Sequence, residues 1–222
     1  MTATDDFAEK LAAATPTPGG GAAAARVGRY ACSLLSMVTG ITLEKIASGK
    51  APASTDSGDL PGSADLQASA DLQASADAAR ELAARFEALE IEDIAAFQAF
   101  LTALRLPRGT EQEKQERSAA RREAAARATE APLATLEASM DVLNLCQRLL
   151  ELSRTTALRA ESDLAAAVEL ANAAYRVAEL NIRVNLPELA AEDGKAARAR
   201  WQDLGRSLDT RYLDLRKALQ EK

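Results

Sequence analysis

Apolar residues recur at intervals of three and four along most of the 222-residue chain, and this spacing predicts amphipathic helices. The clearest stripes run from Ala22 to about Lys45, from Leu82 to Leu104 and from Asp163 to Asn181. Only Leu180 to Leu186 alternates strictly between apolar and polar residues, as a strand does. Because no partner strand is evident, we expect a helix there that gives way to extended chain before Pro187. The pattern therefore predicts an all-α protein.

Proline, glycine and serine mark the breaks between these stripes. Residues 48–62 are rich in Gly, Pro, Ser and Asp and predict a surface loop. A six-residue repeat follows, Ser63-Ala-Asp-Leu-Gln-Ala and its copies, whose period does not match a helical turn, so we expect residues 48–80 to form a loop and a low-complexity insertion that is helical or frayed. Pro132 is expected to start a fresh helix that runs to about Arg154. Composition and length favour one domain over residues 1–222.

The segment Thr15-Pro16-Thr17-Pro18-Gly19-Gly20-Gly21 precedes the first long stripe. The two prolines hold the backbone extended, and the glycines remove every side chain at the point where a helix begins. The free N–H groups of such a helix start suit an anion or a polar carbonyl edge. A tight turn that lets two helices pack closely explains the same residues, so both interpretations stay open here.

Asp93 interrupts an apolar stripe. Leu82, Phe86 and Leu89 precede it and Phe97 follows, and a 100° step per residue places Asp93 in the middle of that stripe. A carboxyl group among phenylalanines loses solvation, which favours its protonated form unless a cation lies nearby. The pattern indicates a functional acid in a cleft, while a buried aspartate that ties a neighbouring helix is the structural alternative.

Composition narrows the chemistry. The chain has no histidine, so acid–base work falls to Asp, Glu, Lys, Tyr or Cys, and a histidine-ligated zinc site is excluded. The net charge of −6 argues against a nucleic-acid surface. Cys32 and Cys146 lie among apolar residues and are expected to be reduced core thiols. No segment has the pattern of a signal peptide or a bilayer span, so we expect a cytoplasmic protein that does not act at a membrane.

Several short motifs occur together along the chain: the Thr15 to Gly21 segment, Ser36-Met37-Val38 with Thr42, Asp93 with Phe97, Leu106-Pro107, Ala131-Pro132-Leu133, Ser162-Asp163-Leu164, and Asn181-Ile182-Arg183-Val184-Asn185-Leu186. In this order and spacing they resemble the cyclodeaminase/methenyltetrahydrofolate cyclohydrolase family, which also forms the C-terminal domain of formiminotransferase-cyclodeaminase. The resemblance implies an up-and-down bundle of about five to seven helices. It also implies a homodimer that acts on one-carbon derivatives of tetrahydrofolate.

The resemblance also implies which residues form the site. Asp93 and Asp163 are the expected catalytic residues. The expected substrate-binding residues are Pro18, Gly19, Gly20, Gly21, Thr42, Lys45, Ser162, Asn181 and Asn185. The reaction is either loss of ammonia from 5-formiminotetrahydrofolate or addition of water to 5,10-methenyltetrahydrofolate, with Asp93 as acid and base. No metal or redox cofactor is expected, and the folate is the substrate.

Three departures from the family pattern leave a second hypothesis open. Leu43-Glu44-Lys45 stands where the family has a Gly-Lys-Lys-Lys-Tyr motif, Ile91 replaces a second acid, and Thr156-Ala157 replaces Gly-Asn. A diverged, non-catalytic helical binding or assembly protein is therefore the alternative to an enzyme. The charged segment from Lys114 to Arg127 is either a solvated face or a basic patch for an acidic ligand tail. Asp163 and Asn181 would lie roughly 27 Å apart on one helix, too far for one small ligand.

Overall fold

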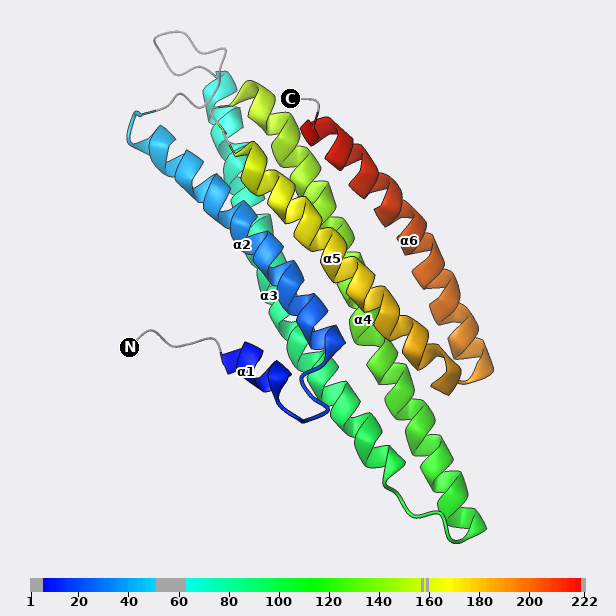
Figure 1. Ribbon diagram of the computed structural model, residues 1–222. Coiled ribbons are helices and arrows are strands. Elements are labelled where there is room, and N and C mark those ends of the chain that lie inside the picture. Colours follow the sequence, from blue (N-terminus) through cyan, green and yellow to red (C-terminus); the bar gives the residue numbers. More distant parts are fainter. Residues whose placement is uncertain (1–5, 51–62, 157, 159, 221–222) are drawn as a thin grey trace.

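The computed structural model describes residues 6–50, 63–156, 158 and 160–220, and nearly all of them are helical. Six α-helices and one short 3₁₀ helix follow one another in the described part of the chain (Figure 1): α1 (Asp6–Ala12), α2 (Gly20–Ala47), α3 (Ser63–Leu104), α4 (Glu111–Thr155), α5 (Glu161–Asn185), η1 (Leu186–Glu188) and α6 (Ala191–Gln220). The described residues contain no strand. The prediction of an all-α domain with about five to seven helices is confirmed.

Helices α2, α3, α4 and α5 form the body of the molecule, and α6 packs along α4 and α5 (Figure 1). Helices α3 and α4 have 42 and 45 residues, whereas α2 and α5 have 28 and 25. The joined ends of α3 and α4 consequently extend past the other helices as a helical hairpin (Figure 1). Thr110 and Glu113 form a reciprocal capping box that starts α4 after this hairpin turn.

Small residues allow the central helices to approach closely. A Cβ atom on Gly28 of α2 would lie 2.3 Å from the Phe86 ring of α3, so the ring occupies the space above this glycine. Leucines from α2, α3 and α4 complete a continuous core, and alanines make up half of the buried residues of α5. Cys32 and Cys146 are buried in this core as free thiols. Burial raises the pKa of the Cys32 thiol to about 12, so it is an inert core group.

Two sequence-based expectations differ from the structure, and for a third, the repeat expected to be helical or frayed, the structure shows a helix. Pro132 lies inside the continuous helix α4 and does not start a new one. Leu186 keeps helical dihedral angles and leads into η1, which contains Pro187, so no extended chain precedes this proline. The six-residue repeat is part of α3 and contributes Leu72 and Ala76 to the buried interior. In each case, packing along a neighbouring long helix outweighs the local signal for a break.

Candidate functional site

The N-terminus of α2 is the centre of the candidate site. Gly19 occupies the N-cap position in an extended conformation and has no side chain with which to cap the helix. The peptide bond between Thr17 and Pro18 is cis. Gln98 of α3 donates a hydrogen bond to the Thr17 hydroxyl at 3.4 Å, which ties the loop to α3. The first N–H groups of α2 have no partner further back in the helix, and such groups favour negative charge nearby.

Asp93 of α3 lies directly against this helix end. A Cβ atom on Gly21 would fall 1.9 Å from Asp93 Oδ1, so only a glycine leaves room for the carboxyl group. Burial raises the pKa of Asp93 from 3.8 to about 6, and a hydrogen bond donated by the backbone N–H of Ala22 partly offsets this effect. Asp93 is thus a partly buried carboxyl group that changes protonation state just below neutral pH. These properties suit a general acid and base.

Two asparagines at the end of α5 complete this side of the molecule. A Cβ atom on Gly20 would lie 3.4 Å from Asn181 Nδ2, so the side chain of Asn181 covers the start of α2. Asn181 Nδ2 donates to the Val177 carbonyl at 2.8 Å. Asn185 Nδ2 donates to the Ala128 carbonyl of α4 at 2.7 Å. Asn185 therefore serves first to hold α5 against α4, while the Oδ1 atom of Asn181 stays available beside Gly20.

A cavity of about 440 Å³ lies between α1, the Thr15–Pro18 loop, α2 and α3. Arg26 and Glu90 form part of its wall through a two-pronged ion pair, in which Arg26 Nε donates to Glu90 Oε2 at 2.8 Å and the terminal nitrogen donates to Oε1 at 2.6 Å. The guanidinium group also lies 3.9 Å above the ring centroid of Phe7. Pro18 lines the same cavity, so a recess with both charged and apolar walls lies next to the Asp93 region.

Sequence reasoning missed Arg26 and Glu90. A signal was present, because Glu90 lies one turn before Asp93 on α3 and Arg26 interrupts the alanine-rich start of α2. Their pairing was not predictable, since the two residues are 64 positions apart in the chain.

The remaining predicted site residues lie at the other end of the α2–α5 pair. Helix α2 starts beside Asn181, so Thr42 and Lys45 near its other end lie toward the start of α5, where Ser162 and Asp163 are located (Figure 1). Thr42 is buried, and its hydroxyl donates to the Val38 carbonyl at 2.8 Å. Lys45 and Ser162 are exposed. Within one chain, the predicted site residues therefore form two groups at opposite ends of α5. Asp163 in one group and Asn181 in the other are 18 residues apart, which is roughly 27 Å along a helix.

Two arginines in the charged segment of α4, from Lys114 to Arg127, contact other parts of the chain. Arg117 donates to the Leu104 carbonyl at the end of α3, with the shorter of two hydrogen bonds at 3.0 Å. Arg121 forms an ion pair with Glu188 of η1. These contacts stabilise the hairpin and the end of α5, so a solvated face does not describe the whole segment.

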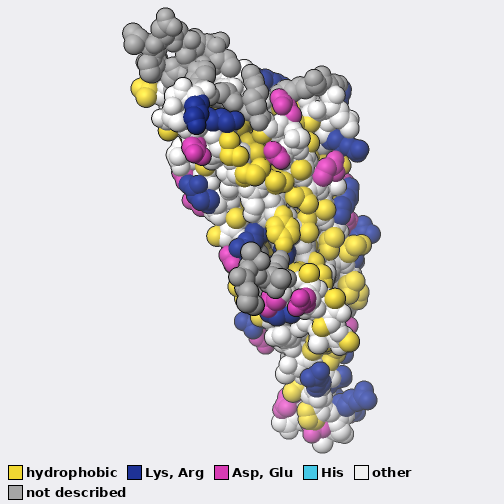
Figure 2. Space-filling model, turned by 60° about the vertical axis from the view of Figure 1, so that its left-hand side comes forward, with side chains coloured by type: hydrophobic (Ala, Val, Ile, Leu, Met, Phe, Trp, Pro, Cys, Tyr) yellow, Lys and Arg dark blue, Asp and Glu magenta, His cyan; other side chains and the backbone are white. Residues whose placement is uncertain are grey.

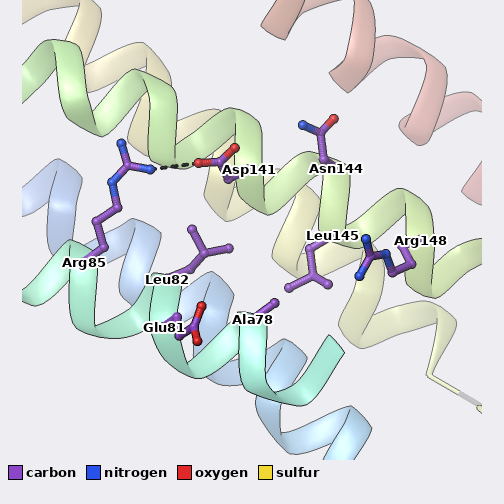
Figure 3. Close-up of a pocket in the computed structure, with 8 residues that line it drawn as sticks. All are labelled: Ala78, Glu81, Leu82, Arg85, Asp141, Asn144, Leu145 and Arg148. Carbon is purple, nitrogen blue, oxygen red and sulfur yellow. Dashed lines mark hydrogen bonds and ion pairs between the residues drawn. The ribbon is translucent and has the colours of Figure 1, made fainter. Parts of the chain in front are cut away.

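A second cavity, of about 400 Å³, lies between α3 and α4, and none of the predicted site residues lines it. Figure 3 shows Arg85 of α3 reaching across to Asp141 of α4, with the two side chains 2.8 Å apart. Asn144 and Arg148 of α4 line the same recess. Since Arg85 also contacts Glu137, the polar groups on this side mainly connect the two helices.

Known proteins are similar to this chain in sequence and in fold. A family model described as formiminotransferase-cyclodeaminase matches residues 3–201. The chain belongs to this family. A methenyltetrahydrofolate cyclohydrolase of Methylorubrum extorquens is 31% identical over 200 residues, which cover 90% of this chain and 86% of that protein. The resemblance seen in the motifs is therefore confirmed.

Two further relatives match over a shorter stretch or at lower identity. A formimidoyltransferase-cyclodeaminase of Sus scrofa is 32% identical over 114 residues, and the match covers 51% of this chain but only 20% of that protein. A crystal structure of formiminotetrahydrofolate cyclodeaminase from Thermotoga maritima superimposes with a TM-score of 0.73 at 22% identity, covering 97% of this chain and 94% of that one. The structural match establishes the shared fold.

Proposed function

We propose that this member of the formiminotransferase-cyclodeaminase family is an enzyme of one-carbon folate metabolism with Asp93 as its acid and base. The observation that carries the proposal is the Asp93 carboxyl group, which lies against the start of α2, accepts a hydrogen bond from the N–H of Ala22 and has its pKa raised to about 6. The names of two relatives, a cyclohydrolase and a cyclodeaminase, indicate a tetrahydrofolate derivative as the substrate.

Both candidate reactions take place at the same carbon, and both require proton transfer to a leaving nitrogen. In the cyclodeaminase reaction, N10 attacks the formimino carbon on N5, a tetrahedral carbon forms, and ammonia leaves after protonation to give the methenyl cation. In the cyclohydrolase reaction, water attacks the methenyl carbon, loses a proton, and the bond to N5 breaks as that nitrogen is protonated. A carboxyl group that titrates near pH 6 can donate and accept these protons. Its anionic form also stabilises the methenyl cation.

Binding in this proposal uses the two features beside Asp93. The N–H groups at the start of α2 suit a carbonyl oxygen of the folate, and the Oδ1 atom of Asn181 is an acceptor next to them. The recess lined by Pro18, Arg26 and Glu90 offers both donors and acceptors for the edge of a polar ring. Gly20→Val tests this role, because valine would crowd the space between Gly20 and Asn181. We expect binding of a reduced folate, measured by calorimetry, to weaken at least tenfold while the helical circular dichroism stays unchanged.

The decisive experiment is an absorbance assay with 5,10-methenyl- and 5-formiminotetrahydrofolate. We expect turnover of at least one of them, and we expect Asp93→Asn to abolish it. Glu92→Gln is the matched control, since it changes the exposed neighbouring carboxylate on the same helix. Absence of turnover with both compounds at pH 5.5, 7 and 8.5 would refute the enzymatic proposal. It would favour the alternative, a non-catalytic helical binding or assembly protein.

The proposal includes three further elements. No metal or redox cofactor takes part, because attack by N10 or water together with proton transfer balances both reactions. The protein acts in the cytoplasm, which agrees with two buried, unpaired cysteines. The chain functions as a homodimer. In the described residues, no helix combines the length and apolar character needed to cross a membrane.

A further inference from the structure

The recess between α3 and α4 is a cavity that the proposed function does not use. Its volume of about 400 Å³ lies within the range of small-molecule sites, which is roughly 300–1,000 Å³. Its lining residues are spaced by three and four positions on each helix, so one side of α3 and one side of α4 face each other across it. Both walls belong to long, continuous helices, which hold the shape of the recess before a ligand binds.

The floor of the recess is apolar. Leu145 is only 5% exposed, and Leu82 and Ala78 pack partly against the core. Figure 3 shows these three side chains between the two helices. The short side chain of Ala78 leaves space on the α3 side that a larger residue would fill. The floor can therefore accept the apolar group of a ligand.

One end of the recess is closed by ion pairs within the chain. Arg85 of α3 lies 2.8 Å from Asp141 and 3.3 Å from Glu137, both on α4. Because two carboxylates already neutralise this guanidinium group, it has little attraction left for an anionic ligand. The groups that bind a ligand must therefore lie toward the other end, where Figure 3 shows Arg148.

Three polar side chains in the rest of the recess are exposed and have no partner of their own: Glu81 on α3, and Asn144 and Arg148 on α4. Within the described part of the chain, these side chains form no hydrogen bond and no ion pair, either with one another or with other residues. Asn144 and Arg148 lie one turn apart on the same side of α4, so their N–H groups can approach one acceptor together. The recess thus presents an unused acceptor on one wall and unused donors on the other.

The charges around the recess are balanced. The described residues that line it include two carboxylates, Glu81 and Asp141, and two guanidinium groups, Arg85 and Arg148. A ligand with a net charge would meet repulsion from one of these pairs, whereas a zwitterion can place each of its charges beside an opposite one. Figure 2 shows a different kind of surface, on which hydrophobic side chains gather along the molecule. The combination of both charges with an apolar floor favours a small amphiphilic zwitterion as the ligand.

We propose that this recess binds a free α-amino acid with a large apolar side chain. The carboxylate of the amino acid pairs with the guanidinium group of Arg148 and accepts a hydrogen bond from Asn144. Its ammonium group donates to the carboxylate of Glu81 across the recess. Its side chain lies on the apolar floor. The proposal does not depend on the proposed function, since none of these residues belongs to the candidate site.

Calorimetry with L-phenylalanine tests binding to the purified protein. We expect a Kd of roughly 1 mM or lower, because a ligand of this size in an open recess makes few contacts. Thermal unfolding should shift upward in the presence of phenylalanine, since the ligand binds only the folded protein. No heat of binding and no thermal shift at about 10 mM phenylalanine would overturn the proposal.

Three analogues test the three contacts separately. 3-Phenylpropanoate lacks the ammonium group, 2-phenylethylamine lacks the carboxylate, and L-alanine lacks the ring. Each should bind at least about threefold more weakly than phenylalanine, because each loses one contact. Equal affinity for phenylalanine and for either singly charged analogue would show that the recess does not recognise a zwitterion.

Two substitutions connect each charge of the ligand to its partner. Glu81→Gln should weaken phenylalanine binding about threefold to tenfold and leave 3-phenylpropanoate nearly unchanged, since that compound has no ammonium group. Arg148→Gln should weaken phenylalanine binding by a similar factor and leave 2-phenylethylamine nearly unchanged. The controls are Glu92→Gln and Arg108→Gln, which change exposed charges outside the recess and should bind phenylalanine as the wild type does. Equal losses in the controls and the site variants would contradict the assignment of these contacts.

Ala78→Phe tests the location of the ligand. The added ring should fill the floor and abolish phenylalanine binding, while the helical circular dichroism stays unchanged because Ala78 is partly exposed. Ala84→Phe is the matched control, since Ala84 is exposed on α3 outside the recess, and it should bind phenylalanine normally. Binding that survives Ala78→Phe would show that the amino acid lies elsewhere and would refute the site.

Discussion

Replacing Asp93 with asparagine should make the protein more stable and at the same time inactive. The carboxyl group of Asp93 has a pKa of about 6 in the folded protein because burial disfavours its charged form. In the unfolded chain the group returns to its ordinary pKa of 3.8. Between these two values the folded protein holds a proton that the unfolded chain has lost. The free energy of unfolding contributed by Asp93 therefore falls as the pH rises from about 4 to about 6.

The size of this effect follows from the two pKa values. A difference of about two units corresponds to about 3 kcal/mol, which is an upper bound because Asp93 keeps some solvent contact. Asparagine has nearly the same shape and can accept the hydrogen bond from the N–H of Ala22, but it carries no charge at any pH. At pH 7.5 we expect the free energy of unfolding of Asp93→Asn to exceed that of the wild type by about 2–3 kcal/mol. Below pH 4 the two proteins should be nearly equal.

Urea unfolding followed by circular dichroism between pH 4 and pH 8 measures this difference. Other carboxyl groups titrate in the same range, but they contribute equally to both proteins and cancel when the curves are subtracted. The Glu92→Gln variant provides the control, since its carboxylate is exposed. The reasoning would be refuted if the wild type were more stable than Asp93→Asn at pH 7.5, or if the difference in stability did not change with pH. Either result would show that burial does not disfavour the charged form of Asp93, and it would remove the physical basis for its role as an acid.

The remaining predictions concern the surroundings of Asp93. Gly21→Ala places a Cβ atom 1.9 Å from the Asp93 carboxyl oxygen, so we expect a loss of about 1–3 kcal/mol in thermal unfolding and at least a tenfold fall in kcat. Gly40→Ala on the same helix meets no atom within 4 Å and should stabilise the protein by about 0.5–1 kcal/mol without changing activity; a comparable loss in both variants would contradict the steric argument. Glu90→Gln weakens the pair with Arg26, and we expect steady-state kinetics to show a higher KM with a nearly unchanged kcat. A fall in kcat alone would instead assign Glu90 to the chemical step.

Much of the fold was predictable because its signals are local. Helical spacing, the capping box at Thr110 and the loop before α2 depend on residues that are close in sequence. The errors arose where a neighbouring helix outweighs a local break: Pro132 remains within α4, and the chain stays helical up to Pro187. Asp93 stood out as a carboxyl group inside an apolar stripe, and the structure shows a partly buried group with a raised pKa at that position.

The sequence by itself determined the helices, the family and the unusual position of Asp93, because periodicity and motifs depend only on the order of residues in the chain. Only the tertiary structure decided what surrounds Asp93. Its carboxyl group fits closely over Gly21, and Asn181 lies beside Gly20. Arg26 pairs with Glu90 nearby. All of these contacts join residues from helices that are far apart in sequence. The same holds for the exposed apolar side chains of α2 and α5, such as Tyr30, Met37 and Leu180, since a periodic stripe in a sequence does not reveal which of its members the packed bundle leaves exposed. Exposure is a property of the packed molecule, because it depends on which helices lie next to one another and not on the order of residues in one helix.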